Sequence, residues 1–194
     1  MKYFVLRHED LAGKFIDGDV IFNPPLADYY QVGEDILEPD TTVSVILDKR
    51  IKKLVSDFFY TTGGAFFASQ EVKSLLEDSR VDLKILPAKI KYFNGRDAES
   101  EYYLVHADAK VACFDYQLSQ YSGKSLVLDR IAKGEFSTDF KVRGINKLHV
   151  KEDMVGALDF FFIKDLIWID PIVSEAFMQA AILRGINVRF EAIA

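Results

Sequence analysis

The sequence contains very few of the residues that build disulfide frameworks and metal sites. Its 194 residues include a single cysteine, Cys113, and only three histidines. One cysteine cannot form an internal disulfide, and the histidines show neither an HExxH motif nor a paired spacing. These shortages exclude a disulfide scaffold, and we expect neither a metal nor another cofactor.

Long apolar runs are also missing. The stretch 158–163 is interrupted by Asp159 and falls well short of the roughly 18 residues that a membrane-spanning helix needs. The N-terminus becomes charged at 7–10, before the apolar core of a signal peptide could form. We therefore expect a soluble, cytoplasmic protein that does not associate with membranes.

Apolar and aromatic residues, by contrast, are plentiful. Hydrophobic residues make up 49% of the chain, and it has 16 phenylalanines, nine tyrosines and one tryptophan. This composition excludes intrinsic disorder, and the length suffices to bury a substantial core. We expect residues 1–194 to form one domain.

The negative charge is concentrated in the first quarter of the chain. Residues 1–48 hold three basic and ten acidic groups, a balance of −7, whereas the remainder is nearly neutral within a total of −6. Binding to nucleic acid is disfavoured, because phosphate recognition requires a basic surface. A basic protein partner fits this acidic N-terminal segment through electrostatic complementarity.

The pattern of residues predicts an α+β fold with mostly antiparallel sheet and two principal helices. Turn residues dominate 12–42, and an α+β body is expected over 43–194. Serine N-caps predict helices at 70–79 and 175–183. Segments rich in β-branched and aromatic residues predict the strands, which we place at 43–47, 52–60, 65–68, 81–93, 102–116, 125–131, 157–169 and 186–193.

Two segments of the chain correspond to one another. When Ser69 is placed on Ser174, a strand, a serine-capped amphipathic helix and a second strand coincide in both. The match predicts two similar β–helix–β units, around 65–93 and 169–194, each burying its helix on a sheet. A chance agreement of two common patterns is the alternative interpretation.

Motifs for catalysis are scarce. His106 and Asp108 could share one face of a strand, which leaves open a small-molecule-binding module or a hydrolase-like enzyme with a cleft around them. Residues 122–125 resemble the end of a phosphate loop, but Leu118 stands where that loop needs glycine, so a polar turn is expected. Cys113 lies in an apolar segment and is expected to be a buried, unreactive thiol.

Four places in the sequence resemble the eleventh immunity family of bacterial polymorphic-toxin systems. They are the Ala68-Ser69 helix start, the Ile85-Leu86-Pro87 strand, the Tyr102-Tyr103 strand followed by Asp115 and Ser119, and the Val173-Ser174 helix ending in the strand 185–190. The resemblance covers roughly residues 43–194 and, more weakly, residues 2–7. It implies a non-enzymatic protein that neutralises a toxin domain by forming a stoichiometric complex.

The resemblance also implies a partner, since immunity proteins of these systems bind a cognate toxin domain and many such domains are basic nucleases. The acidic, aromatic segment 17–40 is the predicted contact surface, because opposed charge speeds association and aromatic side chains anchor interfaces. The predicted toxin-binding residues are Asp28, Tyr29, Tyr30, Glu34, Asp35, Glu38 and Asp40. The alternatives are the enzyme or ligand-binding module around His106 and a structural subunit of a larger assembly.

Overall fold

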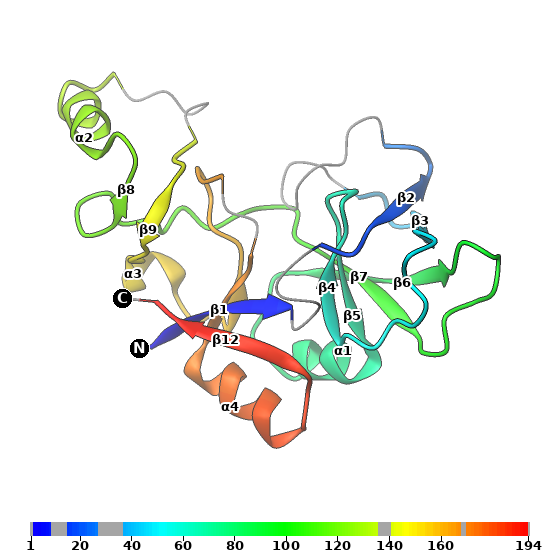
Figure 1. The fold of residues 1–194 in the computed structure, drawn as a ribbon. Helices are drawn as coiled ribbons and strands as arrows, with labels where there is room; N and C mark the ends of the chain where they lie inside the picture. Colours follow the sequence, from blue (N-terminus) through cyan, green and yellow to red (C-terminus); the bar gives the residue numbers. More distant parts are fainter. Residues whose placement is uncertain (1, 9–14, 27–36, 136–140, 168–169, 194) are drawn as a thin grey trace.

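The computed structural model describes residues 2–8, 15–26, 37–135, 141–167 and 170–193. In these residues the chain forms two larger sheets, one two-stranded sheet and four helices (Figure 1). The strands are β1 (Tyr3–His8), β2 (Gly18–Asn23), β3 (Thr42–Leu47), β4 (Phe58–Tyr60), β5 (Phe66–Ser69), β6 (Lys84–Lys91), β7 (Tyr102–His106), β8 (Gln120–Tyr121), β9 (Ile145–Lys147), β10 (Phe160–Phe161), β11 (Ile172–Ser174) and β12 (Val188–Ala192). The helices are α1 (Gln70–Glu77), α2 (Lys124–Ala132), α3 (Glu152–Val155) and α4 (Glu175–Leu183). The predicted α+β class is confirmed.

The six-stranded sheet has the order β2-β3-β6-β7-β5-β4, and the four-stranded sheet has the order β10-β11-β1-β12. All pairs in both sheets are antiparallel except β3 with β6. Pro87 lies where β6 pairs with β7 alone, because the pairing of β6 with β3 begins at Ala88. A residue without an N–H group is tolerated at such a locally unpaired position.

The two larger sheets contain the same arrangement of strands. In the first, β5 leads through α1 to β6, and β7 lies between these two strands. In the second, β11 leads through α4 to β12, and β1 lies between them. A short antiparallel strand, β4 or β10, flanks each set. The N-terminal strand therefore occupies the place that β7 occupies in the first sheet.

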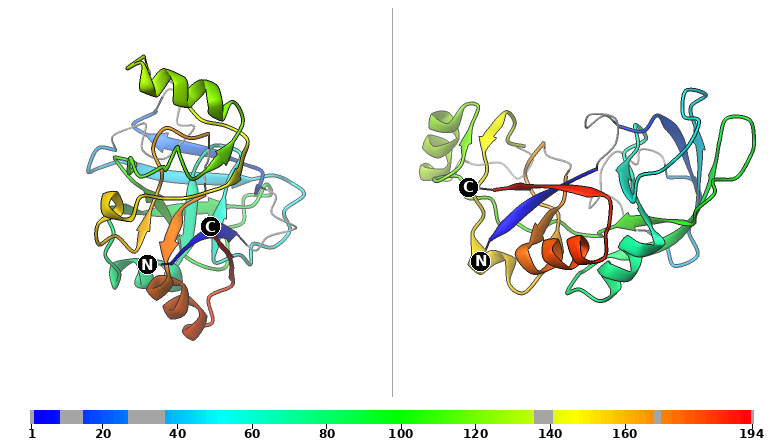
Figure 2. Two further views of the ribbon diagram at one scale, coloured as in Figure 1. Left: turned by 90° about the vertical axis from the view of Figure 1, so that its left-hand side faces the viewer. Right: turned by 60° about the horizontal axis from the view of Figure 1, so that its bottom comes forward.

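Serine caps position both principal helices, as the sequence predicts. The Ser69 hydroxyl accepts from the Val72 N–H at 3.4 Å, and the Ser174 hydroxyl accepts from the Phe177 N–H at 3.2 Å. The two helices lie next to one another on the same side of the molecule (Figure 2). Their buried side chains enter one hydrophobic core that also includes residues of both larger sheets, so the two sets of elements stabilise each other.

Asp159 connects the two sets of elements. Its carboxylate accepts hydrogen bonds from Arg80 Nε at 2.9 Å, Arg80 Nη2 at 3.1 Å and the Arg80 backbone N–H at 3.1 Å. The Ser174 hydroxyl also donates to it, at 2.7 Å. The hydrogen bonds from the Arg80 guanidinium lower the pKa of the Asp159 carboxyl below its ordinary value. This carboxylate therefore joins the loop after α1 to the start of α4.

Asp57 makes the corresponding connection in the opposite direction. Its carboxylate accepts from the backbone N–H of Asn187, in the loop after α4, at 2.7 Å. The Asp57 backbone carbonyl accepts from the Ser69 N–H at 2.7 Å. In the same way, the Asp159 backbone carbonyl accepts from the Ser174 N–H at 2.9 Å. Both aspartates directly precede a Phe-Phe strand, β4 or β10. Asp159, before β10, thus binds the loop between α1 and β6, and Asp57, before β4, binds the loop between α4 and β12.

The third part of the molecule is built around α2, α3 and the pair β8–β9, with a hydrophobic core that it shares with β1, β10 and β11 of the four-stranded sheet. The strand predicted at 125–131 is wrong, because these residues belong to helix α2. Leucine, lysine and arginine favour helix, and the apolar residues 126–128 are consecutive rather than alternating. Residues 122–125 lead from β8 into this helix, with Gly123 at φ 73°.

Cys113 is buried among the side chains of this third core. Burial raises the pKa of its thiol to about 12, so the thiolate that reacts with electrophiles is almost unpopulated near neutral pH. We expect no modification of the native protein by iodoacetamide at pH 7.5 and complete modification in denaturant, as measured by mass spectrometry. Rapid labelling of the folded protein would contradict this prediction.

Candidate functional site

Two of the seven predicted toxin-binding residues, Glu38 and Asp40, lie in the described part of the chain. They belong to an exposed turn that leads into β3, in which Thr41 N donates to the Glu38 carbonyl at 3.1 Å. The other five, Asp28, Tyr29, Tyr30, Glu34 and Asp35, lie outside the described residues. The described part of the acidic segment therefore places two carboxylates at one end of β3.

The acidic turn is attached to the sheet through its neighbour Leu37, whose side chain is buried. Lys84 Nζ donates to the Leu37 carbonyl at 2.7 Å and forms an ion pair with Asp108 at 2.8 Å. These contacts connect the turn to the start of β6 and to the end of β7. The two exposed carboxylates are therefore presented from a firmly attached segment.

The alternative site around His106 is not an open cleft. The His106 side chain is fully buried, and its Nε2 lies 3.3 Å from Asp108 Oδ1. The hydrogen bond from Lys84 lowers the pKa of Asp108, which keeps that carboxylate charged between Lys84 and His106. Through Asp108, the His106 imidazole of β7 is linked to Lys84 of β6. The imidazole itself is buried and is not exposed to a substrate in solution.

Beside the acidic turn lies the outward side of β2, β3 and β6. The pairing sets Ile46 between Asp19 and Lys91, and Ser44 between Ile21 and Lys89. We call these six residues the outer sheet face. Their neighbours along each strand point the other way, into the core formed by residues such as Val43, Val45 and Ile90.

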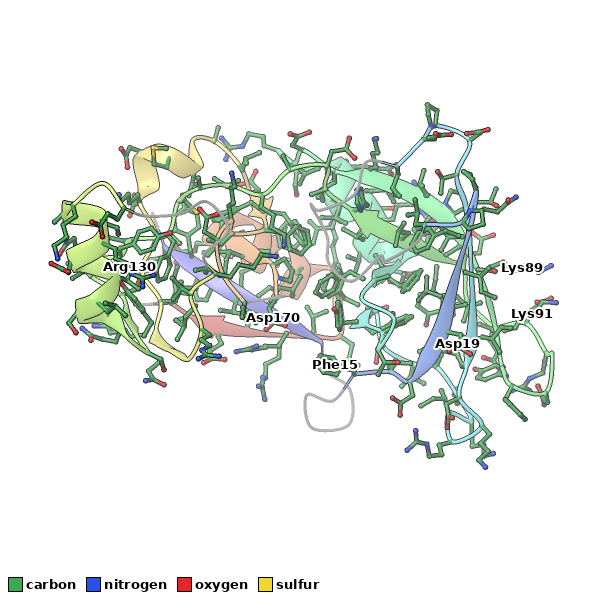
Figure 3. All side chains as sticks on the ribbon, turned by 90° about the horizontal axis from the view of Figure 1, so that it is seen from above. Phe15, Asp19, Lys89, Lys91, Arg130 and Asp170 are labelled. Carbon is green, nitrogen blue, oxygen red and sulfur yellow. The ribbon has the colours of Figure 1, made fainter. Side chains whose placement is uncertain are left out.

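The outer sheet face combines apolar and charged groups. Ile46 is 41% exposed on the middle strand β3, and Ile21 is 48% exposed on the edge strand β2. Lys89 and Lys91 project at one end of the molecule, far from Arg130 at the other end (Figure 3). An apolar centre with a charged margin is the usual composition of a protein-binding surface. The sequence analysis missed these residues, because only the strand pairing brings them together.

The described residues offer little support for other kinds of site. They contain no group of three or more histidine, cysteine, aspartate or glutamate side chains that could hold a metal ion. Among the same residues, no helix is both long and apolar enough to cross a membrane. The outer sheet face and the acidic turn remain as the exposed features that combine apolar and charged groups.

Comparison with protein families identifies the class to which this α+β chain belongs. The model of the Immunity protein family (Imm11) matches residues 16–192. The chain therefore belongs to the Imm11 immunity protein family, as the resemblance of its capped helices and strands predicted. The match includes the acidic segment 17–40, which the resemblance alone did not cover. No curated protein matches the chain.

Proposed function

We propose that this protein is an immunity protein that binds a cognate bacterial toxin domain one-to-one and neutralises it without catalysis. Membership of the Imm11 family over residues 16–192 carries the proposal. The open, partly apolar sheet face and the buried His106 support binding rather than chemistry. On this proposal residues 1–194 act as one immunity domain, in the cytoplasm, where the toxin would otherwise act.

The acidic segment is the proposed first contact with the toxin. Residues 1–48 carry a net charge of −7, and Glu38 and Asp40 lie exposed beside the outer sheet face. The proposed partner is a basic toxin domain of the nuclease class. Opposite charges on the two proteins would accelerate their encounter and disfavour other partners.

A pull-down with the tagged protein from the source cells, washed at rising salt, tests the function. We expect a basic toxin domain to be retained near one-to-one and to be released as salt screens the charges. Co-production of the protein with that domain should also restore bacterial growth. Retention of the toxin regardless of salt would keep the immunity function but reject the acidic segment as its basis.

Charge reversal tests the acidic turn itself. We expect Glu38→Lys with Asp40→Lys to weaken toxin affinity about tenfold, mainly through slower association at low salt. The matched control is Glu135→Lys with Asp153→Lys, which changes the same charge at two exposed residues outside this segment. Surface plasmon resonance gives both rate constants. Equal effects of the two double variants would reject the turn as a specific contact.

A further inference from the structure

The β6–β7 hairpin presents an exposed phenylalanine on a well-defined turn. Gly95 N donates to the Tyr92 carbonyl at 2.8 Å, and Tyr92 N donates to the Arg96 carbonyl at 2.8 Å. Gly95 has φ 85°, which closes this short turn with a residue that tolerates the left-handed region. The turn leaves Phe93 67% exposed. A large aromatic side chain held outward on an ordered turn loses little entropy on binding.

A hollow of about 110 Å³ lies beside this phenylalanine. By the same kind of measure one water needs roughly 10–15 Å³, so the hollow has room for the end of a side chain. It is bounded by the hairpin and by the segment after β3, and it contains cationic groups but no carboxylate. The lining residues are Lys49, Ile51, Lys52, Tyr92, Phe93, Asn94 and Arg96.

The cations around the hollow are incompletely neutralised. Neither Lys49 nor Lys52 forms an ion pair with a carboxylate in the described ranges. Arg96 pairs with Glu99 at 3.2 Å, and its guanidinium carbon lies 4.7 Å from the centre of the Tyr92 ring. A carboxylate entering this hollow would therefore meet the Arg96 guanidinium and two ammonium groups that lack a carboxylate partner, those of Lys49 and Lys52. Such groups favour charge-assisted hydrogen bonds, although the Lys52 ammonium also donates to the Lys49 carbonyl at 2.6 Å.

Tyr92 fixes the floor of the hollow. Its hydroxyl accepts from the Leu54 N–H at 2.9 Å and donates to Glu99 Oε2 at 2.6 Å. The hydroxyl thus holds together the chain after β3 and the hairpin after β6. The positions of the lysines relative to Phe93 and Arg96 are set by this contact before any partner binds, which reduces the cost of binding.

We infer that this hollow, which we call the cationic hollow, receives an aspartate or glutamate side chain of the toxin domain, with Phe93 packed beside it. The inference rests on the proposed function and adds to it a second contact, in which the acidic group belongs to the toxin domain. The parallel pairing of β3 and β6 puts the cationic hollow at one end of β3 and the Glu38–Asp40 turn at the other. Six residues of strand separate them by about 20 Å. Opposite charges at the two ends would fix the orientation of the partner across the outer sheet face.

Affinity for the toxin domain encoded beside this chain, measured by titration calorimetry, tests the inference. We expect Lys52→Glu to weaken binding about 30-fold, because it introduces a repulsive charge at a desolvated contact. Lys53→Glu is the matched control, since Lys53 is an exposed neighbour with the same charge that does not line the hollow. It should weaken binding less than about threefold. Equal losses in the two variants would overturn the inference.

Phe93 is tested in the same way. We expect Phe93→Ala to weaken toxin binding about tenfold, as loss of an aromatic anchor does, whereas Leu183→Ala should leave affinity unchanged. Leu183 is 87% exposed on α4, away from the hairpin. Unchanged affinity in Phe93→Ala would show that the hairpin does not touch the toxin.

A second probe separates failure of the inference from failure of the proposed function. A synthetic peptide of glutamate and leucine is titrated into isotopically labelled protein and followed by NMR. We expect the amide signals of residues 93–96 to shift, and the shifts to disappear in a Lys49→Glu/Lys52→Glu variant. No shift at the hairpin overturns the inference even if the toxin binds. A shift without toxin binding retains the cationic hollow as an acidic-peptide site but rejects the immunity function.

Discussion

Replacing Asp159 with alanine is expected to lower the free energy of unfolding by about 3 kcal/mol, because it removes a buried carboxylate that accepts hydrogen bonds from the buried Ser174 hydroxyl and from the partly exposed Arg80. The residue is only 7% exposed, and its carboxylate accepts four hydrogen bonds from Arg80 and Ser174. Loss of the carboxylate leaves the Ser174 hydroxyl and the Arg80 backbone N–H without their partner, and it releases the loop after α1 from the start of α4.

Urea denaturation followed by circular dichroism measures this loss. Asp153→Ala is the control, because Asp153 is an exposed aspartate on α3 and should change stability by less than about 0.5 kcal/mol. Asp57→Ala should fall between the two, since its carboxylate accepts one hydrogen bond, from Asn187 N. A loss below about 1 kcal/mol for Asp159→Ala would show that the network contributes little.

The same carboxylate is expected to make stability depend on pH. Hydrogen bonds from Arg80 lower the pKa of Asp159 in the folded state, so the folded protein binds this proton less readily than the unfolded chain. The stabilisation is fully present above the unfolded value of about 3.9 and is lost as pH falls through the lowered folded value. The stability gap between wild type and Asp159→Ala should therefore be constant from pH 7 to pH 5 and shrink below pH 4. A gap that grows on acidification would contradict this sign.

Replacing Phe160 with alanine is expected to cost about 4 kcal/mol, the largest single loss among the variants considered. Its side chain is 1% exposed, and its ring lies 6.2 Å from Phe58, 5.5 Å from Phe162 and 5.8 Å from Phe177, measured between centroids. The contact with Phe58 joins β10 to β4, the corresponding strands of the two sheets. The cavity would therefore open in the core that both sheets share.

Thermal unfolding by calorimetry measures the effect, with Phe93→Ala as the matched control. Both variants remove the same ring, but Phe93 is 67% exposed and has few contacts to lose. We expect Phe93→Ala to melt within about 2 °C of wild type and Phe160→Ala to melt far lower. Equal melting temperatures would place Phe160 outside the cooperative core. An unchanged melting temperature in Phe93→Ala would also show that any loss of toxin binding in this variant is not caused by unfolding.

The parts of the fold that local sequence determines were predictable. A serine followed by an apolar helical pattern encodes both α1 and α4, because capping and amphipathicity act within a few residues. Helix α2 was mistaken for a strand, since its apolar residues 126–128 are consecutive and only Val127 is buried. A helix that buries so little has no clear periodic signal, and its propensity is a weak guide.

The proposed binding surface was predictable only in part. The acidic turn was recognised from its composition, which is a local property. The cationic hollow could not be recognised in this way, because it is formed by lysines at 49 and 52 and by a hairpin some forty residues later in the chain. The basic run at 49–53 and the Asn94-Gly95 turn were visible separately. Only the parallel pairing of β3 with β6 brings them together, and that pairing is a long-range feature.

The place of β1 between β11 and β12 has a consequence for synthesis of the protein. Strand β1 is synthesised long before its partners, since Tyr3 pairs with Ser174 and Phe4 with Ala192. At about 5–20 residues per second this delay lasts roughly 10 to 40 seconds. Until then β1 lacks both of the strands that flank it in the second sheet. This sheet can therefore be completed only after translation has passed residue 192, so the second sheet of a newly made molecule forms late in its synthesis.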